Sequence, residues 1–527
     1  MKRAIAPRAG FPWVTTAAIF AAFGASAVFA QGGANAALPT NHAMRAHQLI
    51  EGLDLDEARA ELSQASVDDV DAALEKARLA IYEEDCDGAV AILKRPELAA
   101  SEDGKTLNDI AQGCARVTAA TVSEKDDARN LEVRFQDEAD RALMPMLADT
   151  VQKARDALTR DLGVTWPKPT RVVVVRDLLS LSAMTGLPYE SATTTGTVAV
   201  AKWGRVTLLS PRASHHGFVW RDTMAHELTH LAVTRATNDK APLWLQEGVA
   251  KREEIRWRDP GPFDNRPSPE SVVARGMEMK IDIPLDKLGP SIAMLPTADQ
   301  AMVAFAEVTS FVRFFADHAP ADGLPHLLNA IREKPRGDDK DVDDALREVS
   351  QSDLKSWDGK WRAWLSSTHH DALPSISGLG AAPPNAHDIR ERMRLAELLD
   401  ARSHSAEALK ELDKITEPPL EDPSFSGLRA SVLHHVGRDK DAEPLVSDPK
   451  KVYGSYGPWW AIRGQLAVAR ADQPTADSSF AEAVATDPFD IDAACGTRDP
   501  NAPLPNDPSL HLLCEAARQR AEPVDGE

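Results

Sequence analysis

The chain has 527 residues, and its 60 Lys and Arg against 81 Asp and Glu give a formal net charge of −21 at pH 7. So acidic a surface repels phosphate backbones and anionic membranes, which argues against a nucleic-acid-binding protein. One hydrophobic core does not organise a chain of this length, so two to four domains are expected.

The first thirty residues have the composition of a secretory signal. Lys2, Arg3 and Arg8 precede an apolar, alanine-rich run at 14–29, and cleavage is expected after Ala30. Cleavage would leave 497 residues with a net charge of −24. An uncleaved anchor is the alternative, but no other apolar stretch approaches the ~20 residues that span a bilayer, and no cysteine follows Ala30 to mark a lipoprotein. We therefore expect an exported protein, periplasmic or extracellular, without a membrane span after cleavage.

Residues 44–122 have the periodicity of amphipathic helices, which we expect to form hairpins that stack as a repeat. The apolar positions that carry this pattern are Ala46, Leu49, Ile50, Leu53, Ala58 and Leu62 in one hairpin, and Leu74, Ala77, Ile81, Ala89, Ile92 and Leu93 in another.

The pattern then changes to strands that alternate with helices. Strands are expected at 131–136, at 170–176 and, interrupted near Gly204, within 198–209, with a helix at 142–162. This alternation predicts a small α/β lobe. Helices expected near 299–316, 323–333 and 353–366 would form a helical subdomain beside it.

A metal-binding motif follows the last predicted strand. His226 and His230 are four residues apart on a predicted helix at 220–235, so both imidazoles can face one zinc ion. Glu247, on a second predicted helix a short loop away, is the natural third ligand. Two imidazoles and one carboxylate leave a fourth position open, as in catalytic zinc sites. The alternative is that both histidines lie on a solvated helix face.

The sequence HELTHLAV followed by PLWLQEGVA resembles the gluzincin metallopeptidases, and among them the peptidase-MA-like domains of exported bacterial proteins. The resemblance covers 131–367. It implies one Zn²⁺ per chain, held by His226, His230 and Glu247, with Glu227 as general base and a peptide or protein as substrate.

The ligand histidines also need hydrogen-bond partners that fix their rings. Asp222, one turn before His226, and Glu254, two turns after Glu247, are the candidates. Solvent-exposed carboxylates are the alternative interpretation of both.

Analogy with the same family places an extended substrate along the edge strand that precedes the zinc helix, at Gly196, Thr197 and Val198.

Gluzincins of this type often carry a tyrosine or histidine that donates a hydrogen bond to the oxyanion. At the place on the later helix where a tyrosine is expected, this chain has Phe305. Tyr189, His215 and His216 lie upstream of the zinc helix and could substitute, but the favoured interpretation of each is a surface or packing residue.

Residues 368–387 are rich in proline, glycine and alanine and are expected to be a linker. Beyond it, 388–520 is predicted to hold three tetratricopeptide-like helical repeats. The best match has Trp460, Gly464, Ala476, Phe480, Ala483 and Pro488 at the offsets of one unit. The groove of these repeats could bind a protein partner or pack on the catalytic lobe.

The four cysteines fall into two close pairs, Cys86 with Cys114 and Cys495 with Cys514. In an oxidising compartment this spacing favours two local disulfides, each joining the helices of one hairpin. Free, buried thiols are the alternative.

The predicted fold is therefore α+β, with a zincin-type catalytic domain at 131–367 flanked by helical repeats. Three functions are compatible with the sequence. They are an exported zinc metallopeptidase, a zinc-binding pseudopeptidase whose repeats scaffold a cell-envelope complex, and a repeat-based binding protein whose motif holds no metal.

Overall fold

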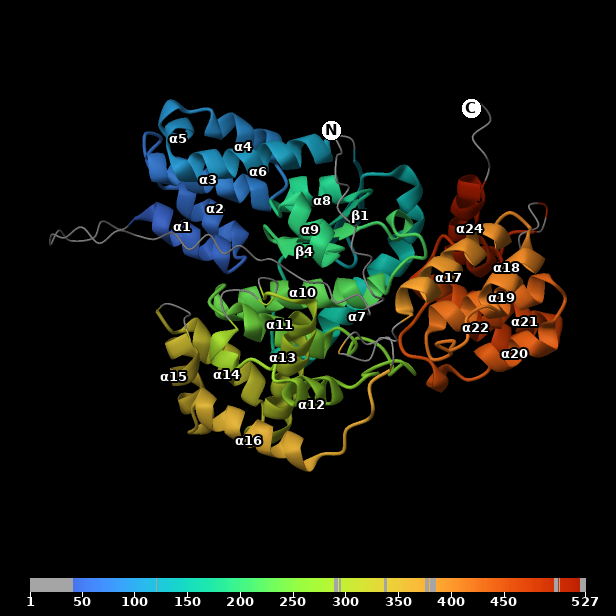
Figure 1. Cartoon of the computed structure of the whole chain (residues 1–527). Coiled ribbons are helices and arrows are strands. Elements are labelled where there is room, and N and C mark those ends of the chain that lie inside the picture. Colours follow the sequence, from blue (N-terminus) through green and yellow to red (C-terminus); the bar gives the residue numbers. More distant parts are fainter. Residues whose placement is uncertain are drawn as a thin grey trace, which may run out of the picture.

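The computed structural model describes residues 41–119, 121–288, 292, 295–335, 339–374, 379, 385–496, 501 and 503–521. The predicted signal peptide at 1–30 lies outside these residues. The fold is α+β: one five-stranded sheet is surrounded by many helices, as expected. Figure 1 shows helices at both ends of the chain on either side of a central region, which we define as residues 122–367. Within the described residues, no helix has the length and apolar character needed to cross a membrane.

The N-terminal region is helical, as its periodicity predicts. Its helices are α1 (His42–Glu51), α2 (Leu55–Ser63), α3 (Val70–Tyr82), α4 (Cys86–Leu93), α5 (Pro96–Ala100) and α6 (Glu102–Thr118). Side-chain oxygens of Asn41, Asp69, Asp85 and Ser101 accept hydrogen bonds from the first free amides of α1, α3, α4 and α6. A disulfide between Cys86 and Cys114 joins α4 to α6, with the two Cα atoms 5.7 Å apart.

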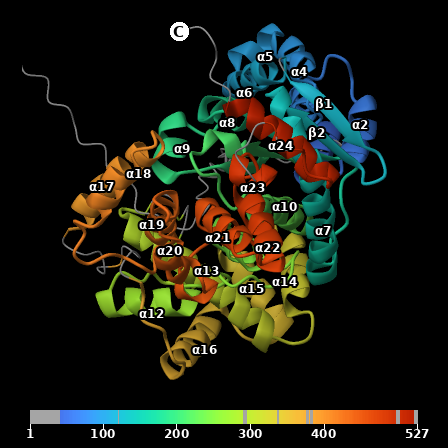
Figure 2. The ribbon, with the colours of Figure 1, turned by 90° about the vertical axis from the view of Figure 1, so that its right-hand side faces the viewer.

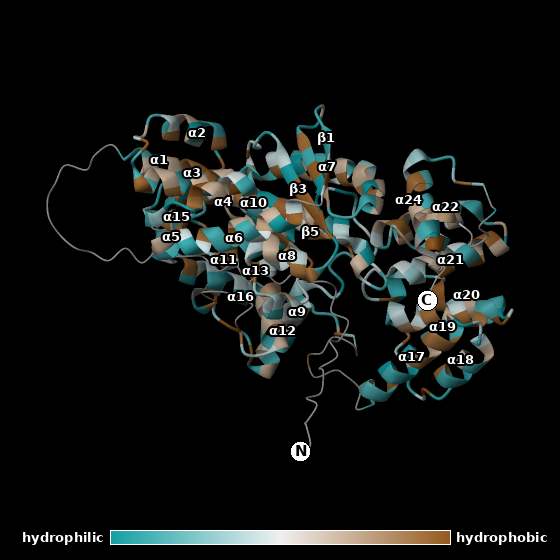
Figure 3. Cartoon of the chain, turned by 90° about the horizontal axis from the view of Figure 1, so that it is seen from above, coloured by the Kyte–Doolittle hydropathy of each residue, from teal (hydrophilic) through white to brown (hydrophobic). Residues whose placement is uncertain are grey.

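The sheet has the strand order β1-β2-β3-β5-β4. Its strands are β1 (Val122–Asp126), β2 (Leu131–Phe135), β3 (Thr170–Val175), β4 (Ala199–Lys202) and β5 (Arg205–Leu209). β2, β3 and β5 run parallel, whereas β1 and β4 are antiparallel edges. β1 was not predicted, because its polar residues do not alternate with apolar ones. All five residues of β5 are buried, and Figure 3 shows hydrophobic residues along this strand.

The turn between β4 and β5 confirms the predicted break near Gly204. Trp203 and Gly204 both have positive φ, 56° and 69°. Two successive residues of positive φ make the tight hairpin turn whose twist matches paired strands. The helices α7 (Met144–Leu162), α8 (Leu178–Thr185) and α9 (Tyr189–Thr195) connect the strands. The first was predicted and the other two were not.

The remainder of the central region is helical. It consists of α10 (Trp220–Thr237), α11 (Leu243–Glu253), α12 (Pro269–Met279), α13 (Ala298–His318), α14 (Gly323–Arg332), α15 (Asp339–Ser350) and α16 (Leu354–Ser367). The zinc-motif helix α10 lies in the centre of the molecule, between the sheet and the helices of the subdomain (Figure 1). Thirteen of its residues are buried, including Trp220, Met224 and Leu228.

Three successive helix pairs form most of the C-terminal region. They are α17 (Ala386–Asp400) with α18 (Ser405–Leu412), α19 (Pro423–His435) with α20 (Asp439–Val446), and α21 (Gly457–Ala469) with α22 (Gln473–Thr486). In the last pair a Cβ atom on Gly464 would lie 2.6 Å from the Phe480 ring, so a small residue is needed there. The hairpins are those that the sequence indicates, and their tetratricopeptide character stays a prediction.

The last two helices of the described residues are α23 (Ile491–Cys495) and α24 (Pro508–Ala521). A disulfide between Cys495 and Cys514 joins them, with the Cα atoms 4.9 Å apart. Both predicted pairings are therefore confirmed in the structure, and the described residues contain no free cysteine. Two disulfides are typical of an oxidising, extracytoplasmic compartment.

The C-terminal helices pack on the central region (Figure 2). The backbone amide of Phe218, just before α10, donates to the carbonyl of Thr486 at 3.0 Å. Phe263 meets Trp460 with ring centroids 5.5 Å apart, and Arg266 lies over the Tyr453 ring at 5.3 Å. These helices were expected either to pack on the region that holds the metal motif or to bind a protein partner. The structure shows such packing, and binding of a partner stays a prediction.

Candidate metal centre

Two helices bring the three predicted zinc ligands together. Nε2 of His226 and Nε2 of His230, one turn apart on α10, are 3.2 Å from each other. Oε2 of Glu247, on α11, lies 3.5 Å from the first of these nitrogens and 3.7 Å from the second. All three side chains are buried, and one ligand atom from each lies within 4.8 Å of the other two. The alternative of two histidines on a solvated helix face is therefore wrong.

The position of Glu247 depends on a glycine next to it. Pro242 and a tight turn after α10 start α11 within a few residues, and Asn238 ends α10 in the left-handed conformation with φ 50°. At Gly248 a Cβ atom would lie 2.6 Å from the backbone carbonyl oxygen of Val308 on α13. The absence of a side chain there lets α11 approach α13 closely, and this contact holds the neighbouring Glu247 against α10.

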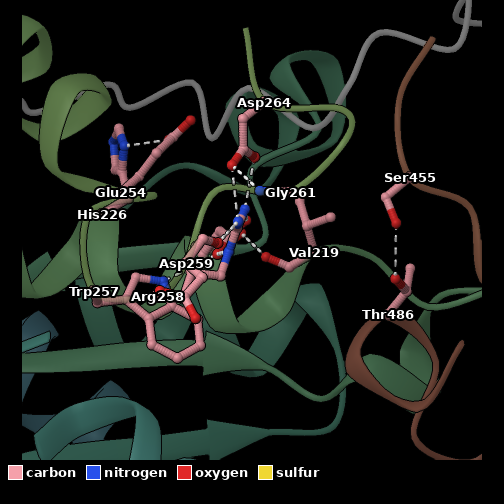
Figure 4. Close-up of polar contacts among 12 residues, drawn as sticks. Val219, His226, Glu254, Trp257, Arg258, Asp259, Gly261, Asp264, Ser455 and Thr486 are labelled. Atoms are coloured by element: carbon pink, nitrogen blue, oxygen red, sulfur yellow. Dashed lines mark hydrogen bonds and ion pairs between the residues drawn. The ribbon is translucent and has the colours of Figure 1, made fainter. Parts of the chain in front are cut away.

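Glu254 holds the first ligand histidine, as the sequence predicts. Its Oε2 accepts a hydrogen bond from Nδ1 of His226 at 3.1 Å (Figure 4). Nε2 of the same ring is left 3.5 Å from Oε2 of Glu247. Lys251, one turn earlier, donates to both Glu254 oxygens, at 3.1 and 2.9 Å. Burial alone would raise the pKa of Glu254, but the Lys251 ammonium and the bond to His226 outweigh it and lower that pKa to about 2. The carboxylate therefore stays ionised and keeps its orientation.

The assignment of Asp222 as a histidine partner is a correction. Its carboxylate binds the Arg258 guanidinium at 2.8 and 2.6 Å and accepts from the Trp257 indole at 3.0 Å. The bidentate guanidinium and the indole together satisfy both oxygens of Asp222, which explains why this carboxylate does not serve as a histidine partner. Arg258 also binds Asp264, at 2.9 and 2.8 Å (Figure 4). The ion pair between Asp222 and Arg258 thus connects α10 to the segment that follows α11.

Glu227 is a buried carboxylate beside the three ligands. It is 0% exposed, and neither of its oxygens has a hydrogen-bond partner of normal geometry. Burial raises the pKa of Glu227 to about 8; the His226 imidazole opposes this rise and the Glu247 carboxylate adds to it. The main-chain amide of Ala201, on the edge strand β4, lies close enough to lower this pKa slightly. Strongly shifted pKa values of this kind gather at functional sites.

The two histidines differ in charge. Burial lowers the pKa of His226, but its bonds to Glu247 and Glu254 outweigh this and raise it to about 9. For His230, burial dominates and lowers the pKa to about 4, so this imidazole is neutral at pH 7.

The donor set fits a bound zinc ion. Oε2 of Glu247 lies 3.5 and 3.7 Å from the two imidazole nitrogens, longer than a normal hydrogen bond, and both oxygens of Glu227 are buried without a hydrogen bond of normal geometry. Buried carboxylates so weakly paired cost free energy, and a cation between the three ligands would offset this cost. Two imidazole nitrogens and one carboxylate oxygen suit Zn²⁺, whereas Ca²⁺ and Mg²⁺ prefer sites built from oxygen. The residues His226, His230 and Glu247 would hold the ion.

The predicted substrate strand is displaced by a few residues. Gly196 ends α9 with φ 67°, and the amide of Thr197 bonds back to Ala192, so both belong to the end of that helix. Val198 accepts from the amide of Leu209 at 2.7 Å and so extends the pairing of β4 with β5. The edge strand itself is Ala199–Lys202. Its existence is confirmed, but Gly196 and Thr197 precede it because α9 extends to Thr195 and Gly196 is the cap of that helix. Pairing of a substrate with this strand stays a prediction.

The structure shows where the suggested oxyanion donors lie relative to the buried ligands. Phe305 is buried on α13, 5% exposed, and offers no donor. His215 and His216 both face Glu397 on α17, at 3.2 and 2.6 Å, rather than the buried ligands. Tyr189 begins α9 and is 41% exposed. The assignment of an oxyanion donor to this tyrosine stays a prediction.

Sequence reasoning missed Lys251, Arg258 and Glu397. Lys251 could have been found, since it is three residues before Glu254 on one helix. Glu397 lies 181 residues from His216, and no pattern in the sequence links the two.

No protein-family model matches this chain, and no curated protein matches it. The class of protein is therefore inferred from the fold and the site alone. A buried His-His-Glu triad with the spacing of His226, His230 and Glu247, beside a mixed five-stranded sheet with an antiparallel edge, is consistent with a zincin-like metal site.

Proposed function

We propose that this protein is an exported zinc metallopeptidase of the gluzincin type. The observation that carries the proposal is the fully buried carboxylate of Glu227, without a hydrogen bond of normal geometry and with its pKa raised to about 8, beside the triad His226, His230 and Glu247. A structural metal site needs no such additional carboxylate, whereas a hydrolase needs a general base at this place.

Each residue has a distinct part in the proposed reaction. Zinc, held by His226, His230 and Glu247, would supply Lewis-acid polarisation of the scissile carbonyl. Glu227 would accept the proton of the attacking water and pass it to the departing amine. Glu254 keeps the His226 ring in the orientation that presents Nε2, because Nδ1 is committed to its carboxylate.

The substrate would bind along the edge strand β4. Within the described residues this strand pairs with β5 alone, and an extended peptide could add to its other edge. Ala201 on this strand lies next to Glu227. A peptide on β4 would therefore pass close to the general base.

The test is hydrolysis of a peptide library by the mature protein, abolished by a chelator and restored by zinc. Glu227→Gln should keep the zinc and lower the rate by at least ~10²-fold, since a positioned general base contributes that much. Glu307→Gln is the matched control, because Glu307 is an equally buried carboxylate on α13 whose pKa is also raised to about 8. Equal activity of the wild type and Glu227→Gln would refute the mechanism.

A zinc-binding pseudopeptidase that scaffolds an envelope complex is the second candidate. It is favoured by the burial of Glu227 and all three ligands, of which His230 is the most exposed at 7%, and by Phe305 in the place expected for a donor. Loss of one oxyanion donor costs on the order of 3 kcal/mol in other hydrolases. A wild type that binds zinc normally and hydrolyses no peptide would establish this function instead.

A further inference from the structure

A second group of two histidines and one glutamate lies where the central region meets the C-terminal helices. His215 and His216 are in the segment that leads into α10, and Glu397 is on α17. Nε2 of His215 is 3.2 Å, and Nε2 of His216 is 2.6 Å, from the same oxygen, Oε1 of Glu397. As in the buried centre, one ligand atom from each residue lies within 4.8 Å of the other two.

Two histidines face one carboxylate oxygen here, whereas a simple ion pair needs only one. A single imidazole satisfies a carboxylate, yet here two adjacent rings, with centroids 4.0 Å apart, turn toward one oxygen. The Tyr456 ring stands edge-on to His216 at 5.2 Å and restricts its movement. The His215 side chain is 77% exposed, so a cation can reach the site from solvent. Water could then occupy the coordination positions of the cation that the three side chains do not fill.

We propose that His215, His216 and Glu397 form a second binding site for Zn²⁺ or a similar imidazole-preferring divalent cation. Two nitrogens and one carboxylate oxygen favour zinc, nickel or copper over calcium and magnesium. The site is separate from the buried triad, because no residue is shared, and it does not depend on peptidase activity.

A cation at this site would join two parts of the protein that are distant in sequence. Gly217 to Val219 alone separate His216 from the first residue of α10, and Phe218 already bonds to the backbone of Thr486. Glu397 is in the first helix after the predicted linker. Metal binding would therefore fasten α17 to the segment that leads into the helix carrying the buried triad.

The test is the stoichiometry of zinc in the full mature chain, prepared without a histidine tag, stripped of metal and titrated with Zn²⁺ alone by calorimetry and native mass spectrometry. The wild type should bind two equivalents. His215→Ala and Glu397→Gln should each lose one equivalent and keep the other, whereas His230→Ala should lose the buried one. His215 is largely exposed, so its replacement should leave the fold intact.

His435→Ala is the matched control. His434 and His435 are also adjacent, but they pair with different carboxylates, Asp439 at 2.8 Å and Asp400 at 3.0 Å. This variant should therefore keep both equivalents. Zn²⁺ should also raise the melting temperature of His230→Ala, and that rise should vanish when Glu397→Gln is added. A wild type with one equivalent, or a second equivalent retained in both His215→Ala and Glu397→Gln, would overturn the proposal.

Discussion

Oε2 of Glu254 accepts a hydrogen bond from Nδ1 of His226 at 3.1 Å, across the gap between the end of α11 and the middle of α10. One carboxylate thereby selects the tautomer of the imidazole and directs Nε2 at Glu247. The metal centre is thus fixed by contacts between helices as much as by the spacing of residues along one helix.

Removal of this contact should weaken metal binding without removing a ligand. Glu254→Ala is expected to lower zinc affinity by about 10–100-fold, the usual cost of losing such a partner. Glu254→Gln should cost less, since its amide oxygen can still accept from Nδ1. Competition with a chromophoric chelator measures the affinity. Lys251→Met is the control, because it removes the lysine and leaves the His226 contact; an unchanged affinity in Glu254→Ala would contradict the assignment.

Gly248→Ala should disturb both the fold and the site. The added methyl would meet the Val308 carbonyl at 2.6 Å, and a backbone atom cannot rotate away. Overpacking of this kind costs about 1–3 kcal/mol, and the shift of α11 should also weaken zinc binding through Glu247. Gly359→Ala, on α16 with nothing within 4 Å of its Cβ, should instead stabilise the protein by about 0.5–1 kcal/mol. Urea unfolding of both variants provides the comparison, and equal effects would refute the close-contact explanation.

The free energy of unfolding of the helical subdomain that contains α13 should fall as the pH rises from about 4.5 to about 8. Burial raises the pKa of Glu307 from its ordinary 4.5 to about 8, although the backbone amide of Ile283 and Arg362 oppose this. The folded state holds this proton more tightly than the unfolded state, so the stabilising effect is complete below about 4.5 and is lost as the pH approaches 8. Glu307→Gln should remove this dependence.

The measurement is the urea midpoint of the wild type and Glu307→Gln at pH 5 and pH 8.5. The gain in unfolding free energy of the variant over the wild type should grow by about 4 kcal/mol between the two pH values, since about three pKa units lie between pH 5 and the folded pKa and one unit corresponds to about 1.4 kcal/mol. An advantage that is the same at both pH values would show that the Glu307 carboxylate titrates normally.

The two disulfides should be recovered by non-reducing peptide mapping of exported protein. Cys86 should be linked to Cys114, and Cys495 to Cys514, with loops of 28 and 19 residues. Replacing Cys86 and Cys114 together by serine should cost about 3 kcal/mol, because the unfolded chain regains loop entropy. Four free thiols, or pairs exchanged between the two ends, would contradict the structure.

The sequence by itself determined the parts of this protein that depend on neighbours along the chain. His226 and His230 are one helical turn apart in any α-helix, so their common face follows from helix geometry alone. The apolar periodicity located the helical regions at both ends, the valine-rich run located β3, and close cysteine pairs indicated the disulfides. Glu247 and Glu254 were also within reach, because the helix that carries them follows the motif after a few residues.

Only the tertiary structure decided which distant side chains meet. Asp222 is correctly spaced for His226, yet it binds Arg258, since the bend after α11 returns a guanidinium to the same face of α10. Likewise His215 and His216 gained Glu397 only when the C-terminal helices packed against the segment before α10. Such contacts depend on how helices that are distant in the sequence pack against one another. A pattern of neighbouring residues carries no information about that packing.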